Sequence, residues 1–144
     1  MINICIHGHF YQPPRENPWT GEIEKQDSAE PYHDWNERIH HECYQANSEA
    51  EIIDDTGKVV AIINNYELLN FNFGATLLAW ILHKHPETYN KIIEADRNSI
   101  TAHNGHGNAI AMCYNHMIMP LANLNDKITQ VLWGLADFKH HFGR

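Results

Sequence analysis

Apolar and polar residues follow one another in a pattern that predicts short strands alternating with helices. The run from Ile2 to Ile6 is mostly apolar and is typical of a buried strand. A second strand is expected at Leu68 to Phe73, where apolar and polar residues alternate, and Gly74 ends it before a helix from Ala75 to about His83. Strand, glycine and helix in this order make up the βα unit of a parallel sheet, so the pattern predicts an α/β protein.

The segment between these two strands is predicted to hold a helix and one further element. Asp34 can cap a helix that begins at Trp35, because its carboxylate accepts hydrogen bonds from free backbone N–H groups of the first turn. Farther along, two apolar segments, 51–53 and 59–63, flank the turn-like sequence Asp54-Asp55-Thr56-Gly57. They form either a hairpin or a turn that leads into a short helix, and the second alternative is favoured.

Helical periodicity returns in the C-terminal half of the chain. A helix is expected from Glu87 to Ala95, and a short third strand from Ser99 to Ala102. The last helix has the most regular apolar spacing, with steps of three and four residues between Ile128, Val131, Leu132, Leu135, Phe138 and Phe142. Asn125 or Asp126 is expected to cap its start and Gly143 its end.

A long loop is expected after the first strand. The residues from Glu16 to Pro31 are mostly polar, include two helix breakers and show no period of either kind. Aromatic residues gather around this loop, at Phe10, Tyr11, Trp19, Tyr32 and Trp35. Their rings either stack on sugar faces or fix the loop to the protein, except that Trp35 begins a helix and is expected to be structural.

The overall charge narrows the range of partners. The chain has 144 residues, enough for one ordinary domain, and 18 acidic against 10 basic residues give a formal net charge of −8. This charge repels phosphate backbones and anionic lipids, so neither nucleic acid nor a membrane is expected as a partner. The three cysteines show no close pairing, which fits a reducing compartment. We therefore expect a cytoplasmic protein.

Histidine is the residue type that points most clearly to chemistry. His7 and His9 face the same side if the first strand stays extended, at the strand end where α/β proteins bind ligands. Among twelve histidines, the candidate metal ligands are His7, His9, His103, His106 and His116. No tight zinc-binding spacing such as His-Glu-x-x-His occurs in the sequence, so we expect no metal. Solvated surface positions are expected for His40, His41, His83, His85, His140 and His141.

Three separated segments share one resemblance. The first is His7-Gly8-His9-Phe10-Tyr11-Gln12-Pro13-Pro14, the second runs from Phe71 to Leu78, and the third runs from Gly105 to Leu121. The first segment is similar to the first sequence block of glycoside hydrolase family 57, and the third segment is similar to the second block of that family. The second segment is similar to a strand-to-helix step of the family that contains an Asn. The loop from Pro14 to Trp19 resembles a branch of that family related to α-amylases and α-mannosidases.

The resemblance implies a fold and an activity. Residues 1–144 would be the N-terminal portion of a single barrel domain, the first three βα units of an incomplete (β/α)7 TIM-like barrel with parallel strands. The activity implied is hydrolysis or transfer on α-linked glycans with retention, by a Glu nucleophile and an Asp acid, without a cofactor. Both carboxylates are expected beyond Arg144, in the remainder of the barrel, so no catalytic residue is assigned here. Asn108 stands where the family commonly has a Glu, and an amide can orient a sugar but cannot exchange its proton.

The substrate implied is an α-glucan or related oligosaccharide. The substrate-binding residues implied are His7, His9, Gln12, Asn72, His106 and Asn108. We expect the first two strands to be parallel neighbours, so that these histidines, Asn72 and the turn at Gly105 to Asn108 surround one concavity. The last helix is expected to pack Val131, Leu135 and Phe138 on the outer side of the sheet.

Two other functions stay open from the sequence. The His-x-His pair suits a metal-dependent hydrolase similar to polysaccharide deacetylases. The same polar and aromatic residues suit a carbohydrate-binding module without catalytic activity.

Overall fold

A short parallel sheet lies at the centre of the computed structural model, which describes residues 4–144. Strand β1 (His7–Phe10) pairs in parallel with β4 (Asn70–Phe73), in a register that places His9 beside Asn72. The predicted parallel pairing is thus confirmed, although β1 begins later than expected. The strand expected at 2–6 lies partly outside the described residues, and Ile4 and Ile6 are exposed because β4 begins too late to cover them.

A helical segment follows the long loop. Helix α1 (Trp35–Ile39) continues through the π-helical turn η2 (His40–Gln45) into α2 (Ala46–Ser48). Asp34 caps α1 as predicted, because its carboxylate accepts hydrogen bonds from the backbone N–H groups of Asn36 and Glu37. The preceding loop contains only the short 3-10 turn η1 (Asp27–Ala29), which agrees with the prediction of a long irregular segment.

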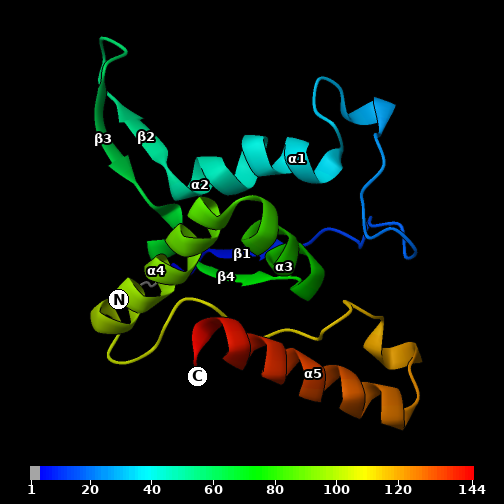
Figure 1. The fold of residues 1–144 in the computed structure, drawn as a ribbon. Helices are drawn as coiled ribbons and strands as arrows, with labels where there is room; N and C mark the ends of the chain where they lie inside the picture. The colour runs from blue at the N-terminus through cyan, green and yellow to red at the C-terminus, as the bar shows by residue number, and fades with distance from the viewer. Residues whose placement is uncertain (1–3) are drawn as a thin grey trace.

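Strands β2 (Ala50–Ile53) and β3 (Val59–Ile63) form an antiparallel hairpin that projects from the rest of the molecule (Figure 1). The favoured alternative, a turn leading into a short helix, is therefore wrong. Asp54 closes the turn by accepting hydrogen bonds from the backbone N–H groups of Thr56 and Lys58. The β-branched residues on both sides of the turn favour extended backbone, and this preference prevails.

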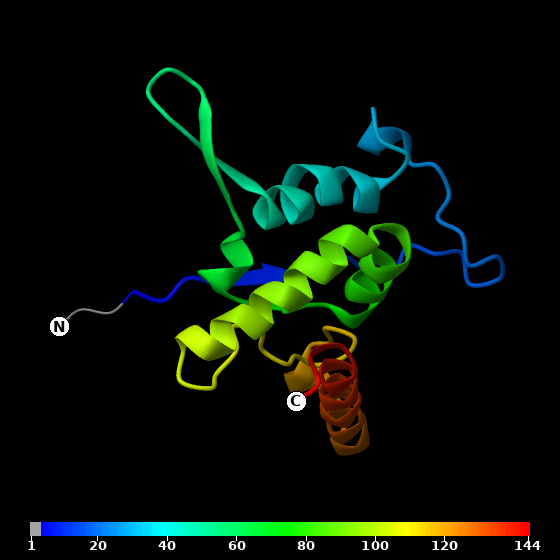
Figure 2. The same ribbon diagram turned by 60° about the vertical axis from the view of Figure 1, so that its left-hand side comes forward.

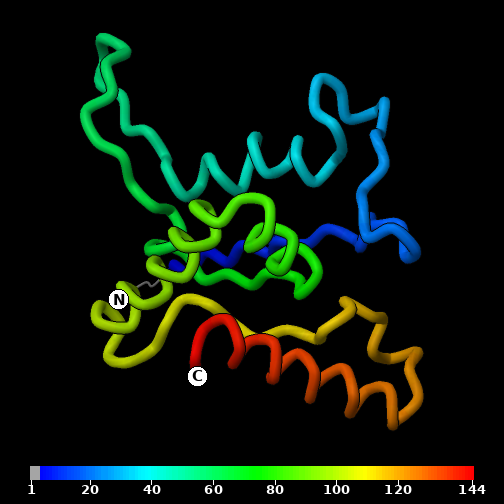
Figure 3. Tube along the Cα trace, viewed as in Figure 1, coloured from blue at the N-terminus to red at the C-terminus, as the bar shows by residue number. Residues whose placement is uncertain are grey.

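Helices cover the face of the parallel sheet on which the core lies. Helices α3 (Ala75–Lys84) and α4 (Pro86–Ala102) lie on this face and α5 (Leu124–Phe142) packs beside them, with Phe138 and Phe142 on the same core, while α1 and α2 lie over α3 and α4 (Figures 1 and 2). The Cα trace shows the chain returning from α4 along the sheet before it enters α5 (Figure 3). Two further 3-10 turns, η3 (Asn65–Glu67) and η4 (Met119–Leu121), precede β4 and α5.

The third strand expected at Ser99 to Ala102 is wrong, because these residues form the last turn of α4. The Ser99 hydroxyl donates a hydrogen bond to the carbonyl oxygen of Asp96 and accepts one from the backbone N–H of Asn108. The Ser99 hydroxyl therefore has both a hydrogen-bond acceptor and a donor while its backbone stays helical.

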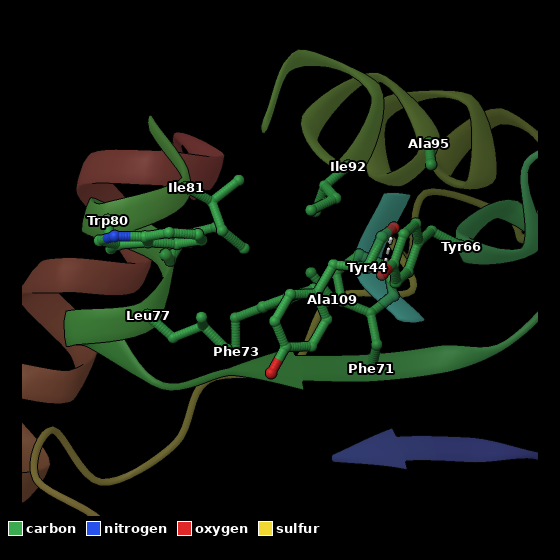
Figure 4. Close-up of a cluster of buried hydrophobic side chains, with 11 residues drawn as sticks. Tyr44, Tyr66, Phe71, Phe73, Leu77, Trp80, Ile81, Ile92, Ala95 and Ala109 are labelled. Carbon is green, nitrogen blue, oxygen red and sulfur yellow. Dashed lines mark hydrogen bonds between the residues drawn. The ribbon is translucent and has the colours of Figure 1, made fainter. Parts of the chain in front are cut away.

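The hydrophobic core lies between β4 and the helices α3 and α4. Phe71 and Phe73 point from β4 toward these helices (Figure 4), and both are buried. The same cluster contains Tyr44, Tyr66, Leu77, Leu78, Trp80, Ile81, Ile92, Ala95 and Ala109. Burying each large apolar side chain contributes about 1.5–3 kcal/mol, so this cluster fixes β4 and leaves Asn72 on the opposite face of the strand.

The prediction of an incomplete (β/α)7 barrel with three parallel βα units is wrong. The described residues form a small α/β domain with one parallel two-stranded sheet and one antiparallel hairpin. Ala109 adds an isolated parallel bridge to Phe71 and no further strand. A barrel requires successive parallel strands, whereas here an antiparallel hairpin intervenes between β1 and β4 and the expected third strand is helical.

Helix α5 has the predicted end and a different start. Gly143 terminates it in the left-handed conformation, with φ of +76°. Asn123, rather than Asn125 or Asp126, is the cap, and its side chain accepts a hydrogen bond from the backbone N–H of Asp126. No helix between residues 4 and 144 combines the length and apolar character of a membrane span.

The face of α5 that contacts the sheet differs from the predicted one. Phe138 packs on the core as expected, but Val131 and Leu135 are 44% and 52% exposed. Gly134 is buried against the backbone carbonyl of Met112, where a Cβ atom would clash. Gly134 is therefore the point at which α5 comes closest to the rest of the protein. Because the helix faces the protein with this glycine, the side chains of Val131 and Leu135 face outward.

Candidate functional site

His9 and Asn72 form the centre of the candidate site. They are register partners on β1 and β4, and Nδ1 of His9 lies 2.6 Å from Oδ1 of Asn72. An amide oxygen only accepts hydrogen bonds, so Nδ1 of His9 carries the proton and donates it. Nε2 of a neutral His9 is then left with a free lone pair.

His116 uses this lone pair. Its Nε2 lies 2.9 Å from Nε2 of His9, and the two rings are 4.8 Å apart. With His9 neutral, His116 donates from Nε2 and keeps its own Nδ1 as an acceptor. His116 has a φ of +50°, a left-handed conformation that is uncommon outside glycine and is found most often at functional sites.

Tyr11 completes a cluster of three rings. Its ring stacks on His116 with a centroid distance of 4.3 Å and lies 6.4 Å from the ring of His9. Tyr11 also packs on the backbone at Gly74, where an added Cβ would meet the Tyr ring. The cluster of His9, Tyr11, Asn72 and His116 thus presents an aromatic surface together with an ordered chain of donors and acceptors.

A cavity also lies at this end of the sheet, although none of the four cluster residues lines it. Its volume is about 650 Å³, and Ala75 and Thr76, which follow directly after β4, form part of its wall. Carboxylates from the long loop and from α5 also line it, namely Glu16, Glu22 and Asp137. A cavity of this size is suited to a small ligand, and its carboxylates are strong hydrogen-bond acceptors.

Two of the predicted residues, His7 and Gln12, lie near the cluster without joining it. His7 is exposed at the start of β1, where it pairs in register with Asn70. The Gln12 amide donates a 3.4 Å hydrogen bond to the Tyr44 hydroxyl and accepts a 2.8 Å hydrogen bond from Arg15. Gln12 therefore fixes the exit from β1 to the protein.

The turn from Gly105 to Asn108 lies at the other end of the sheet. Asn108 is buried, and its amide donates hydrogen bonds to the backbone carbonyls of Tyr66 and Glu67. His106 lines a separate cavity with residues that precede β1 and β4. The expected joint concavity of this turn with His9 and Asn72 does not form, because the parallel bridge at Ala109 makes the chain enter at the start of β4.

One group of residues could hold a metal ion. Ligand atoms of Glu37, His40 and His85 lie within 4.8 Å of one another, and no other such group of three occurs within residues 4–144. Burial, followed by the charges of His85 and His41, lowers the pKa of His40 to about 4. His40 is only 5% exposed, so the sequence-based expectation that it is solvated is wrong.

The sequence points to three members of the candidate cluster. His9 and Asn72 follow from the expected parallel strands, and Tyr11 is one of the aromatic residues that can stack on a sugar. His116 lies in the third resembling segment and is a sequence candidate only as a metal ligand, since 107 residues separate it from His9. No local motif could pair these two histidines. Comparisons of the chain with protein-family models, with curated proteins and with solved structures give no match.

Proposed function

We propose that this protein binds a glycan at the C-terminal end of β1 and β4, as the carbohydrate-binding part of a hydrolase or transglycosylase that acts on α-linked glycans. The observation that carries the proposal is the cluster of His9, Tyr11, Asn72 and His116. Sugar rings offer apolar faces that pack on aromatic side chains and hydroxyl groups that both donate and accept hydrogen bonds. The cluster offers both kinds of contact on one surface.

The hydrogen-bond order within the cluster supports this function. Asn72 fixes the tautomer of His9, and His9 in turn orients His116. The Nδ1 atom of His116 makes no hydrogen bond with any described residue, so it can accept one from a sugar hydroxyl. Groups that are oriented before the ligand arrives lose little entropy when they bind it.

The three segments that resemble glycoside hydrolase family 57 also support the proposal. His9 lies in the first segment, Asn72 in the second and His116 in the third, and the fold brings them within hydrogen-bond distance. None of the four cluster residues lines the cavity of about 650 Å³, so the support comes from the cluster itself.

The proposal assigns binding and orientation to this cluster. Glycoside cleavage uses a pair of carboxyl groups that flank the scissile bond. Within residues 4–144, no Asp or Glu hydrogen-bonds to His9, Asn72 or His116. The imidazoles can position hydroxyl groups, and the proposal gives them no step in bond cleavage.

A metal-dependent deacetylase-like function receives less support. His9 pairs with His116, whereas His7 lies at the start of the strand, and no group of three ligands that includes them occurs in the described part of the chain. Hydrolytic zinc sites generally use three protein ligands.

Calorimetric titration with maltotetraose and with an α-linked mannobiose tests the proposal. We expect the wild-type protein to bind at least one of them, and His9→Ala, Tyr11→Ala and His116→Ala to weaken binding roughly tenfold or more, because each removes a contact worth about 1.4 kcal/mol or more. His103→Ala is the matched control, since His103 is exposed on the turn at the far end of the sheet. Equal affinity in all variants, or no binding by the wild type, would contradict the proposal.

A further inference from the structure

Glu37, His40 and His85 form a second group of side chains away from the His9 cluster. Their ligand atoms lie within 4.8 Å of one another. Nε2 of His85 is 2.9 Å from Oε2 of Glu37, and the rings of His40 and His85 stack at a centroid distance of 3.6 Å. Two imidazoles and one carboxylate are therefore already close together.

Two separate elements supply these residues. Glu37 and His40 are three positions apart on the helical segment that runs from α1 into η2, so they share one face of it. His85 lies between α3 and α4, directly before Pro86. A π-helical turn begins at His40, and such turns occur frequently at functional sites.

The hydrogen bonds leave the group able to accept a cation. Nε2 of His40 is 2.9 Å from the Thr88 hydroxyl, and Nδ1 of His40 has no hydrogen-bond partner among the described residues. Nε2 of His85 faces the carboxylate of Glu37 and releases its proton when it coordinates a cation. The cluster thus combines imidazole nitrogens with a carboxylate, a donor set that suits a divalent cation.

We propose that Glu37, His40 and His85 bind one Zn²⁺ ion. Two histidines and one glutamate are a donor set that zinc sites use, and such sites keep a further position for water. A cavity of about 430 Å³ borders all three residues, with His41 and Glu87 also in its wall, so water can reach the ion.

Zinc binding requires one local movement. The lone pairs of stacked imidazoles run side by side, so the His85 ring has to turn out of the stack for both rings to coordinate one ion. The His85 side chain is 25% exposed and borders the cavity, which gives it room to turn. The distance between Oε2 of Glu37 and Nε2 of His85 has to increase from 2.9 Å to roughly 3.3 Å, the separation of two ligands of a tetrahedral zinc ion.

The bound ion would connect the α1–η2 segment to the junction of α3 and α4. Because this geometry exists only in the folded protein, zinc would stabilise the fold. The three residues are distinct from those of the His9 cluster, although Glu37 also borders the cavity of about 650 Å³.

Calorimetric titration with ZnCl₂, together with thermal unfolding with and without zinc, tests this proposal. The wild-type protein is expected to bind one equivalent and to unfold at a higher temperature with zinc. Glu37→Gln and His85→Gln, checked for folding by circular dichroism, are expected to weaken binding roughly tenfold or more and to abolish the zinc-dependent stabilisation.

Two control variants identify the source of any zinc binding. His103→Gln, at an exposed position, and His9→Gln, in the glycan cluster, are expected to bind zinc as the wild type does. The proposal is overturned if the wild type does not bind zinc at micromolar concentration. It is also overturned if Glu37→Gln and His85→Gln bind normally, or if His9→Gln is the variant that loses the ion.

Discussion

The side-chain amide of Asn108 donates a 2.8 Å hydrogen bond to the backbone carbonyl oxygen of Glu67. A second hydrogen bond, of 3.2 Å, joins the same amide to the carbonyl oxygen of Tyr66. Asn108 is 3% exposed, so these bonds lie in the interior and hold the turn before β4 in place. The residue that resembles part of a sugar-binding motif thus has a structural role in this fold.

Asn108→Ala is accordingly expected to destabilise the protein and to leave the glycan affinity of the folded molecules unchanged. The substitution leaves the buried carbonyl of Tyr66 and the partly buried carbonyl of Glu67 without this donor, which costs about 1–3 kcal/mol. Urea unfolding and calorimetric titration measure the two quantities. Asn90→Ala, at an exposed position of α4, is the control. If Asn108→Ala bound the glycan more weakly and were as stable as the wild type, Asn108 would belong to the binding site.

Gly134→Ala is expected to lower the free energy of unfolding by about 1–3 kcal/mol, because an added methyl group meets the carbonyl of Met112 and pushes α5 away from the sheet. The same change on a freely accessible helix face would stabilise the helix, since alanine has the higher helix propensity. Asn125→Ala, exposed in the first turn of α5, provides that comparison. A Gly134→Ala variant as stable as the wild type would show that α5 does not lie on this contact.

The stability of the metal-free protein is expected to fall as the pH is lowered from about 6.5 toward 4. Burial is the main reason why the pKa of His40 falls to about 4 from the ordinary value of 6.5, and the nearby His85 and His41 add to it. Within this interval the unfolded chain binds a proton that folded His40 does not, so acid favours unfolding. Above pH 6.5 both states are neutral at this position, and the full stability is retained.

Urea unfolding at several pH values, with a chelator present, measures this dependence. His40→Gln is expected to reduce the slope between pH 6.5 and 4, and His103→Gln to keep it. Glu37→Gln is included as a further variant, because Glu37 pairs with His85 beside His40. Identical slopes for His40→Gln and the wild type would show that folding does not lower the pKa of His40.

Local signals in the sequence predicted several elements correctly. The cap at Asp34, the start of α3 after Gly74 and the end of α5 at Gly143 depend only on neighbouring residues. The hairpin at 50–63 also has local causes, namely its β-branched residues and the Asp54 turn, which outweigh the helical alternative. The extension of α4 through Ser99 and the orientation of α5 depend on contacts with other segments. The carbonyl of Met112, for example, decides which face of α5 is buried, and no periodicity of the helix reveals it.

The candidate site was predictable to the same extent. Parallel pairing of two strands was enough to bring His9 beside Asn72. The places of His116 and Asn108 depend on where the chain returns to the sheet. It returns at Ala109, beside Phe71, so Asn108 lies at the start of β4 and the residues that follow lead to the other end.

Nuclear magnetic resonance of the imidazole nitrogens tests the central claim most directly. In protein labelled with ¹⁵N histidine, the His9 ring is expected to be protonated at Nδ1 before any ligand is added, because it donates to Asn72. Titration with maltotetraose or the α-linked mannobiose is expected to shift the nitrogen signals of His9 and His116, while those of His103 and His106 stay in place. Shifts at His103 or His106 with no change at His9 and His116 would contradict the account.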